Sequence, residues 1–273
     1  MILDTGSAFT FLFRDGAHDL GLALKPLTEV EFYGATGQTH VMETNVAEFR
    51  LANLVARNVN LVVSGSGGKS GPQGLLGAYF LLQSDFEFDF AAKKLRFFRP
   101  KGCTGDQVVY WGTAYSVASM LGSGDEKQIR VTVKVDGNPV VAEMDTGSNE
   151  SLIETGVAER AGVKTASVGV TAGGTMAGVS GDCVATYVGV FPSFAFGDEI
   201  IKNARLRIAN LFLGDKEMVL GSRLPHSTGG GSEMLLGADF FRSHRVYVAS
   251  SQRKVYISYV GGPVFRAPVP TTK

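Results

Sequence analysis

The chain has 273 residues, of which 44% are hydrophobic and 19% are charged, so it can bury a sizeable core and lacks the composition of a disordered segment. Its 26 basic and 26 acidic residues balance, which gives no electrostatic reason to expect nucleic acid or an anionic membrane as a partner. No uninterrupted apolar run of about 18 residues occurs, so the sequence predicts no membrane span.

Short strand patterns make up the first part of the chain. A hydrophobic run ends at Asp4-Thr5-Gly6-Ser7, and one or two helical turns stopped by a glycine follow within residues 8–24. Leu75–Leu82 is expected to be a buried strand that turns into a short helix. Alternating or β-branched residues predict further strands at 28–33, 38–42, 46–51, 58–63, 86–90 and 94–98.

The second part of the chain follows a connecting segment that contains the only tryptophan, Trp111, which we expect to pack between units. Alternating apolar residues over 128–135 and a return through Val141 predict a hairpin that leads into Asp145-Thr146-Gly147-Ser148. Residues 210–232, which include three successive glycines, are predicted to be an inserted surface loop.

The two parts repeat the same motifs in the same order. At a shift of 141 residues the two Asp-Thr-Gly-Ser motifs coincide, and at a shift of 145 Asn58 meets Asn203. At a shift of 160 Leu75-Leu76-Gly77 meets Leu235-Leu236-Gly237. Slowly growing offsets are what duplication followed by loop insertion leaves.

The duplicated aspartates suggest a specific chemistry. One Asp-Thr-Gly alone is usually only a turn. Two carboxyl groups brought together share a proton, so that one can activate water as a base while the other, protonated, polarises a carbonyl group.

These paired motifs resemble those of the retropepsin-like aspartic proteases, in a tandem version with both units in one chain. The resemblance covers nearly the whole chain. It implies an all-β fold of two retropepsin-like units, barrel-like with short helices, packed as a pseudo-two-fold pair around the active site. The units would span residues 1–101 and 128–273, with 102–127 connecting them.

The resemblance also assigns roles to residues. Asp4 and Asp145 would be the catalytic pair, and the Leu-Leu-Gly strands would close ψ-shaped loops around the aspartate turns. The remaining turn residues would hold the carboxylates by hydrogen bonding: Thr5, Gly6, Ser7, Thr146, Gly147 and Ser148. The candidate flaps over the site are Gly34, Ala35, Thr36 and Gly37 in the first unit, and Gly178, Val179, Ser180 and Gly181 in the second.

The expected function is therefore aspartic endopeptidase, with an extended polypeptide as substrate and no cofactor. The alternative is a non-catalytic peptide-binding module on the same fold, although both copies keep Asp, Thr, Gly and Ser. One departure is Tyr79, which stands where the second copy has Asp239. Apolar residues lie near the motifs and suggest that the protein prefers substrates with hydrophobic side chains: Phe11, Leu12 and Ile153.

Other chemistries have less support in the sequence. The four histidines are scattered without metal-ligand spacing, so we expect no metal. No Gly-x-Ser-x-Gly elbow is present for an α/β-hydrolase. A glycosidase would also use paired carboxylates, but it would not explain why their neighbours are duplicated. Cys103 and Cys183 could form a disulfide or remain thiols.

The start of the chain leads to a further expectation. The second unit reaches its aspartate through a full hairpin, whereas only Met1-Ile2-Leu3 precede Asp4. We expect the natural chain to begin further upstream, where a signal segment would make a periplasmic or secreted location the favoured one. The alternative is that a strand from a second molecule fills the gap, so a homodimer stays open beside a monomer with an internal pseudo-dimer.

Overall fold

The computed structural model describes residues 1–34, 37–51, 54–68, 71–99, 103, 105–123, 127–177, 183–211 and 231–265. In these residues strands form three sheets and every helix is short. The fold is therefore mostly β, as the strand patterns predicted.

A six-stranded sheet is built from the first part of the chain. Its strands lie in the order β1 (Ile2–Asp4), β6 (Gly74–Gly77), β2 (Phe11–Leu12), β5 (Leu54–Val63), β4 (Gly37–Leu51) and β3 (Lys25–Gly34). The helix α1 (Arg14–Asp19) follows β2, and α2 (Ala78–Leu81) follows β6. The patterns at 38–42 and 46–51 belong to one strand, β4, rather than to two.

A seven-stranded sheet is built from the second part. Its order is β10 (Arg130–Val135), β11 (Asn138–Met144), β16 (Met234–Leu236), β12 (Leu152–Glu154), β15 (Glu199–Ala209), β14 (Cys183–Phe196) and β13 (Thr171–Ala177). The helix α3 (Thr155–Arg160) follows β12, and α5 (Ala238–Ser243) follows β16.

The two sheets have the same strand order from β1 to β3 and from β11 to β13. The sequence repeat is therefore also a repeat of topology. The second sheet adds β10, so that β11 pairs with both β10 and β16. Among the described strands, β1 pairs with β6 alone.

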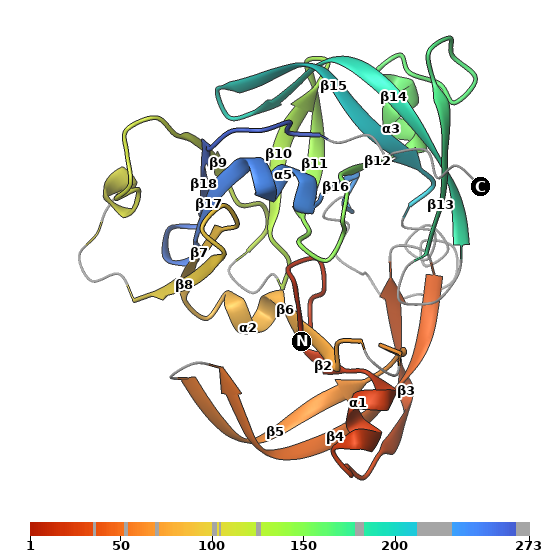
Figure 1. Cartoon of the computed structure of the whole chain (residues 1–273), viewed down its shortest axis with the longest axis vertical. Coiled ribbons are helices and arrows are strands. Elements are labelled where there is room, and N and C mark those ends of the chain that lie inside the picture. The colour runs from red at the N-terminus through yellow and green to blue at the C-terminus, as the bar shows by residue number, and fades with distance from the viewer. Residues whose placement is uncertain are drawn as a thin grey trace.

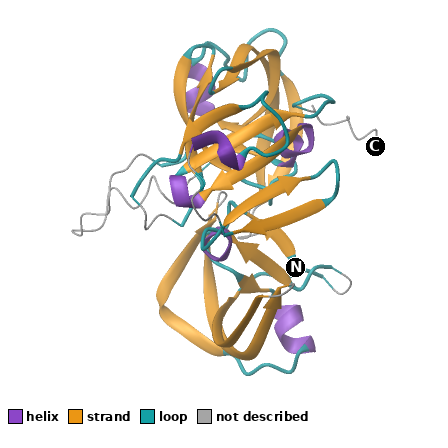
Figure 2. Ribbon diagram, turned by 90° about the vertical axis from the view of Figure 1, so that its left-hand side faces the viewer, coloured by secondary structure: helices purple, strands orange, loops and turns teal. Residues whose placement is uncertain are grey.

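A third sheet joins the two parts of the chain. Its five strands lie in the order β8 (Lys94–Phe98), β7 (Asp85–Asp89), β17 (His244–Ala249), β18 (Lys254–Tyr259) and β9 (Ser116–Ser119). The 3-10 helix η1 (Gly105–Val108) precedes β9, and η2 (Ser250–Gln252) links β17 to β18. Figure 1 shows this sheet on the left, between the seven-stranded sheet above and the six-stranded sheet below. These two sheets remain separate in the perpendicular view (Figure 2).

The largest hydrophobic core also contains residues from both parts of the chain. Phe86 and Phe88 of β7 belong to one buried cluster with Phe240 and Phe241 of α5. The rings of Phe88 and Phe241 meet edge to face with centroids 5.4 Å apart. Because β7 is buried along its whole length, its alternating aromatic residues pack against the second half of the molecule rather than facing solvent.

Candidate active site

Asp4 and Asp145 occupy equivalent turns. Asp4 ends β1, and its Oδ1 accepts hydrogen bonds of 3.0 Å from the backbone N–H groups of Gly6 and Ser7. Asp145 follows β11, and its Oδ1 accepts from the N–H groups of Gly147 at 2.9 Å and Ser148 at 3.2 Å. Each turn thus folds back on its own carboxyl group and fixes its orientation.

The two turns are tied together by their threonines. The backbone N–H of Thr5 donates to Thr146 Oγ1 at 3.1 Å, and the N–H of Thr146 donates to Thr5 Oγ1 at 3.0 Å. The Thr5 hydroxyl donates to Met144 O at 2.6 Å, and the Thr146 hydroxyl donates to Leu3 O at 2.8 Å. This reciprocal set crosses from one half of the chain to the other and brings the aspartates together.

The glycines of the motif let each turn approach the opposite carboxyl group. A Cβ atom on Gly6 would lie 2.4 Å from Asp145 Cγ, and one on Gly147 would lie 2.4 Å from Asp4 Cγ. Any side chain at either position would therefore displace a carboxyl group. The two carboxyl groups also lie close enough for each to affect the pKa of the other.

The Leu-Leu-Gly strands run behind the turns. β6 lies between β1 and β2, and β16 lies between β11 and β12. Gly77 N–H donates to Thr10 Oγ1 at 3.0 Å, and Gly237 N–H donates to Ser151 Oγ at 2.9 Å. Sequence reasoning missed Thr10 and Ser151, although their shared hydroxyls lie at the same shift of 141 as the aspartates.

The two halves differ at the residue that follows each Leu-Leu-Gly-Ala segment, which is Asp239 in the second half and Tyr79 in the first. The Ser151 hydroxyl donates to Asp239 Oδ1 at 2.7 Å in a buried contact. Burial raises the pKa of Asp239, and the hydrogen bonds from Ser151 and Phe240 oppose this. Tyr79 in the same place is 55% exposed, so the first unit has no buried acid there.

The electrostatic surroundings of Asp4 and Asp145 differ. Burial raises the pKa of Asp4, while hydrogen bonds from Ser7, Asp145 and Gly6 lower it. Burial, followed by the charges of Asp4 and Glu143, raises the pKa of Asp145 well above its usual range. Two buried carboxyl groups in contact cannot both ionise cheaply, so one proton stays on the pair.

The candidate flaps are only partly described. Gly34 and Gly37 pair at the end of the β3–β4 hairpin, while Ala35 and Thr36 lie outside the described residues. Gly178, Val179, Ser180 and Gly181 also lie outside them, between β13 and β14. Gly173 and Gly174 lie inside β13, at a shift in its register with β14, so they are not the tip of that hairpin.

The apolar residues that suggested a hydrophobic substrate preference lie in the core. Phe11, Leu12 and Ile153 are all buried and belong to three different core clusters. Their burial removes the basis of that expectation, because the apolar residues after each turn pack in the core rather than line a binding surface. The substrate preference itself stays a prediction.

Trp111 packs against a buried cluster that contains Tyr247 of β17. Phe98 of β8 packs against the same cluster, so that Trp111 lies beside both halves. The Trp111 Nε1–H donates to Ser258 Oγ at 3.0 Å, and Arg245 lies over the Trp111 ring.

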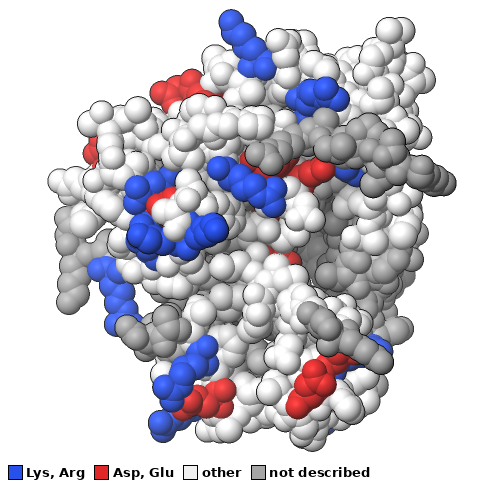
Figure 3. Space-filling view, in the orientation of Figure 1, with Lys and Arg blue, Asp and Glu red and all other residues white. Residues whose placement is uncertain are grey.

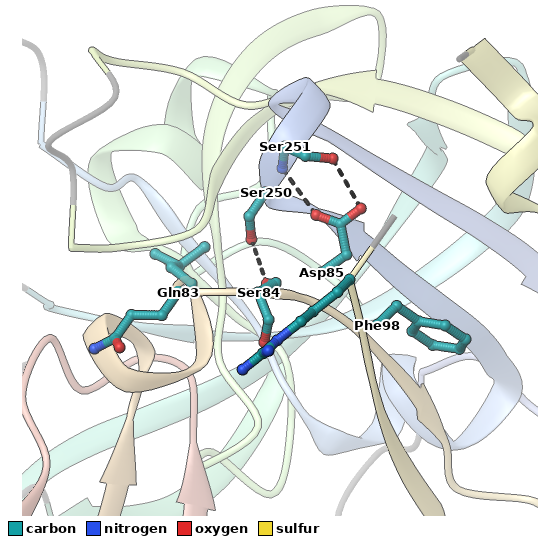
Figure 4. A pocket seen from close by; sticks show the side chains of 8 residues that line it. Gln83, Ser84, Asp85, Phe98, Ser250 and Ser251 are labelled. Atoms are coloured by element: carbon teal, nitrogen blue, oxygen red, sulfur yellow. Dashed lines mark hydrogen bonds between the residues drawn. The ribbon is translucent and has the colours of Figure 1, made fainter. Parts of the chain in front are cut away.

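A surface pocket of about 300 Å³ lies elsewhere, lined by residues of the α2–β7 turn, β8 and η2. Its buried acid, Asp85, accepts hydrogen bonds from Ser251 N–H at 2.8 Å and Ser251 Oγ at 2.9 Å (Figure 4). Ser250 Oγ donates to Ser84 O at 3.0 Å. These groups are occupied in joining η2 to β7, and neither aspartate turn contributes to the pocket.

Neither charge nor metal-ligand chemistry points to a second site within the part of the chain that the structure describes. Both signs of charge occur on the face drawn in Figure 3, over the upper and the lower half. Across the described ranges, no group of three His, Cys, Asp or Glu side chains is placed to hold a metal ion, and no helix is long and apolar enough to cross a membrane. Cys103 and Cys183 are both exposed and are not bonded to each other.

Comparison with known proteins follows the same two segments. A family model described as aspartyl protease matches residues 1–80 and 131–240. The chain is similar to the crystal structure of a retropepsin-like aspartic protease from Rickettsia conorii, with 12% sequence identity and a TM-score of 0.34 over 54% of this chain and 91% of that one. No curated protein matches the sequence.

Proposed function

Because the chain belongs to the aspartyl protease family, we propose that it is an endopeptidase in which Asp4 and Asp145 activate water against a peptide bond. The observation that carries this proposal is the reciprocal contact of the two turns. Each motif glycine lies against the opposite carboxyl group, so both carboxyl groups face one shared position.

The proposed reaction uses one proton on the pair. The ionised aspartate takes a proton from a water molecule, and the water oxygen forms a bond to the carbonyl carbon of the peptide. The protonated aspartate donates its proton to the carbonyl oxygen, which gives a tetrahedral intermediate. The first aspartate then passes the proton that it took from water to the amide nitrogen, the C–N bond breaks, and the second aspartate takes back a proton from a hydroxyl of the intermediate as the carboxylic acid product forms. A pair held by backbone N–H groups and threonine hydroxyls is already oriented before substrate arrives, which lowers the cost of reaching the transition state.

One chain supplies both aspartates, so we propose that the monomer is the active species. Residues 1–101 and 128–273 would each provide one aspartate, with 102–127 as the connection. An extended polypeptide is the proposed substrate, held through backbone hydrogen bonds by the β3–β4 and β13–β14 hairpins.

The proposal is tested by cleavage of an unstructured protein across pH. Asp145→Asn and Asp4→Asn should each lower the rate by at least about 100-fold, because either change removes the group that gives or takes the proton. Thermal unfolding of both variants provides the folding control. Cleavage by folded Asp145→Asn at the wild-type rate would exclude the dyad, and a wild type that binds peptides without cleaving them would indicate a binding module.

A further inference from the structure

Glu143 is a buried acid that the proposed reaction does not use. It lies in β11, two residues before Asp145, and is 3% exposed. Its Oε1 accepts a hydrogen bond from Gln128 Nε2 at 3.1 Å, and its Oε2 accepts from Ser232 Oγ at 2.7 Å. Both contacts satisfy a carboxylate oxygen and so stabilise the charged form.

This acid faces the same side of the chain as Asp145. Side chains two residues apart in extended backbone point to one face and are separated by about 7 Å. The backbone stays extended here, since Asp145 N–H donates to Leu236 O at 2.8 Å in continuation of the β11–β16 pairing. The charge of Glu143 therefore acts on Asp145 through the protein interior.

The first half of the chain has no such acid. Position 2, which corresponds to position 143 at the shift of 141, is Ile2, and it is 37% exposed. The hydrogen bonds around the two aspartates are otherwise matched pairwise. The second half of the chain therefore has a buried acid two residues before its aspartate, and the first half has none at the equivalent position.

The groups around Glu143 oppose one another. Burial raises its pKa to about 7, and the nearby charge of Asp4 acts in the same direction. The Ser232 hydroxyl, the Gln128 amide and the charge of Arg130, its cross-strand partner on β10, lower it. On β16 its neighbour is the uncharged Leu235.

We propose that Glu143 is a positioning residue that keeps the shared proton of the dyad on Asp145, so that Asp145 is the acid and Asp4 is the base. This assignment rests on the proposed function for its catalytic meaning. In the reaction, Asp4 removes the proton of water while the water oxygen bonds to the carbonyl carbon. Asp145 gives its proton to the carbonyl oxygen.

The charge of Glu143 should raise the pKa of Asp145, and this direction can be tested. An ionised Glu143 disfavours a second negative charge on Asp145, so its removal lets Asp145 lose its proton at lower pH. Because the pKa of Glu143 is about 7, this effect is fully present only above about pH 7 and is lost as the pH falls below it. In ¹³C-labelled protein, the carboxyl resonance of Asp145, identified by its loss in Asp145→Asn, can be followed from about pH 3 to about pH 10. In Glu143→Gln its midpoint should fall by about one pH unit.

Two further variants complete this experiment. Glu143→Ile, which copies the residue of the first half, should give the same shift and serves if Glu143→Gln does not fold. Glu233→Gln is the matched control, since Glu233 accepts from Val141 N–H at 3.0 Å and pairs with Arg160 near the surface. It should leave the midpoint unchanged. An unchanged Asp145 midpoint in folded Glu143→Gln overturns the proposal.

The pH profile of kcat/KM gives a second readout. Its alkaline limb should move to lower pH in Glu143→Gln by the same amount as the resonance, whereas structural damage alone would lower the profile without moving the limb. If the resonance shifts but the wild type cleaves nothing, the proposed function fails and the placement of the proton stands. If the wild type cleaves and the resonance does not shift, only the role of Glu143 fails.

Discussion

Among individual residues of the candidate site, the glycines of the two turns leave no room for a side chain. Gly6 and Gly147 lie against the carboxyl groups of Asp145 and Asp4, and neither has a left-handed backbone conformation. Their role is therefore steric: they make room for the opposite carboxyl group rather than permit an unusual turn.

Gly6→Ala should displace the Asp145 carboxyl group and lower the rate of cleavage by about 100-fold, since errors of about 1 Å in catalytic groups have effects of this size. The control is Gly112→Ala, because a Cβ atom there would meet nothing within 4 Å. Initial rates on an unstructured substrate, measured beside thermal unfolding, check the result. Wild-type rates in folded Gly6→Ala would contradict the close contact.

At the scale of the element, the duplicated strands preserve unusual backbone conformations. Asn58 in β5 and Asn203 in β15 both have a φ of 52°, at the shift of 145 seen in the sequence. Lys93 and Arg253, which precede β8 and β18, both have a φ of 54°. Asparagine adopts this left-handed region more readily than most residues, so the shared Asn marks a shared bend in the strand.

Asn203→Ala should lower the free energy of unfolding by about 1 to 2 kcal/mol, because alanine pays the full steric cost of the left-handed conformation. Asn203→Gly should stay within about 0.5 kcal/mol of the wild type, since glycine adopts this conformation readily. Urea unfolding of the two variants measures the difference. Equal effects of both substitutions would show that side-chain contacts of Asn203, rather than its φ angle, matter.

At the scale of the whole molecule, a buried charge network holds the halves together in the five-stranded sheet. Glu87 of β7 is fully buried and accepts hydrogen bonds from Arg245 Nε of β17 at 3.0 Å, from Tyr110 OH at 2.6 Å and from Arg96 of β8. Burial and the contact with Glu87 raise the pKa of Tyr110. Arg245 also lies over the ring of Trp111, 4.4 Å from its centroid.

Glu87→Gln should lower the free energy of unfolding by about 3 kcal/mol, because it removes the fully buried carboxylate from two partly buried guanidinium groups. Arg96 and Arg245 then keep only the carboxylate of Asp89, at 3.3 Å and 3.9 Å. Glu48→Gln is the matched control, as Glu48 pairs with Arg50 at 2.7 Å on an exposed strand and should change stability by less than about 1 kcal/mol. Denaturant unfolding checks both. A loss as small in Glu87→Gln as in Glu48→Gln would mean that sheet pairing and apolar packing alone join the halves.

Features that depend on local sequence patterns could be predicted before the structure was known. The two aspartate motifs, the Leu-Leu-Gly strands that run behind them and the hairpins at 86–98 and 128–141 were all predicted, because turn chemistry and strand alternation depend on neighbouring residues. The duplication supports these predictions. Each motif occurs twice in the same order, and the two sheets repeat the same strand order.

Features that depend on contacts between residues far apart in the sequence became visible in the folded chain alone. The pairing of β7 with β17 brings Glu87 to Arg245, 158 residues away, and no local pattern specifies that partner. A local pattern of apolar residues does not show whether those residues line a binding surface or lie in the core, because both faces of a strand can be buried. Phe11, Leu12 and Ile153 suggested a hydrophobic substrate preference for this reason, although they lie in the core. The same limit concealed Glu143, because burial and the carboxyl groups around it arise only when β10, β11 and β16 lie side by side with Asp4 close to them.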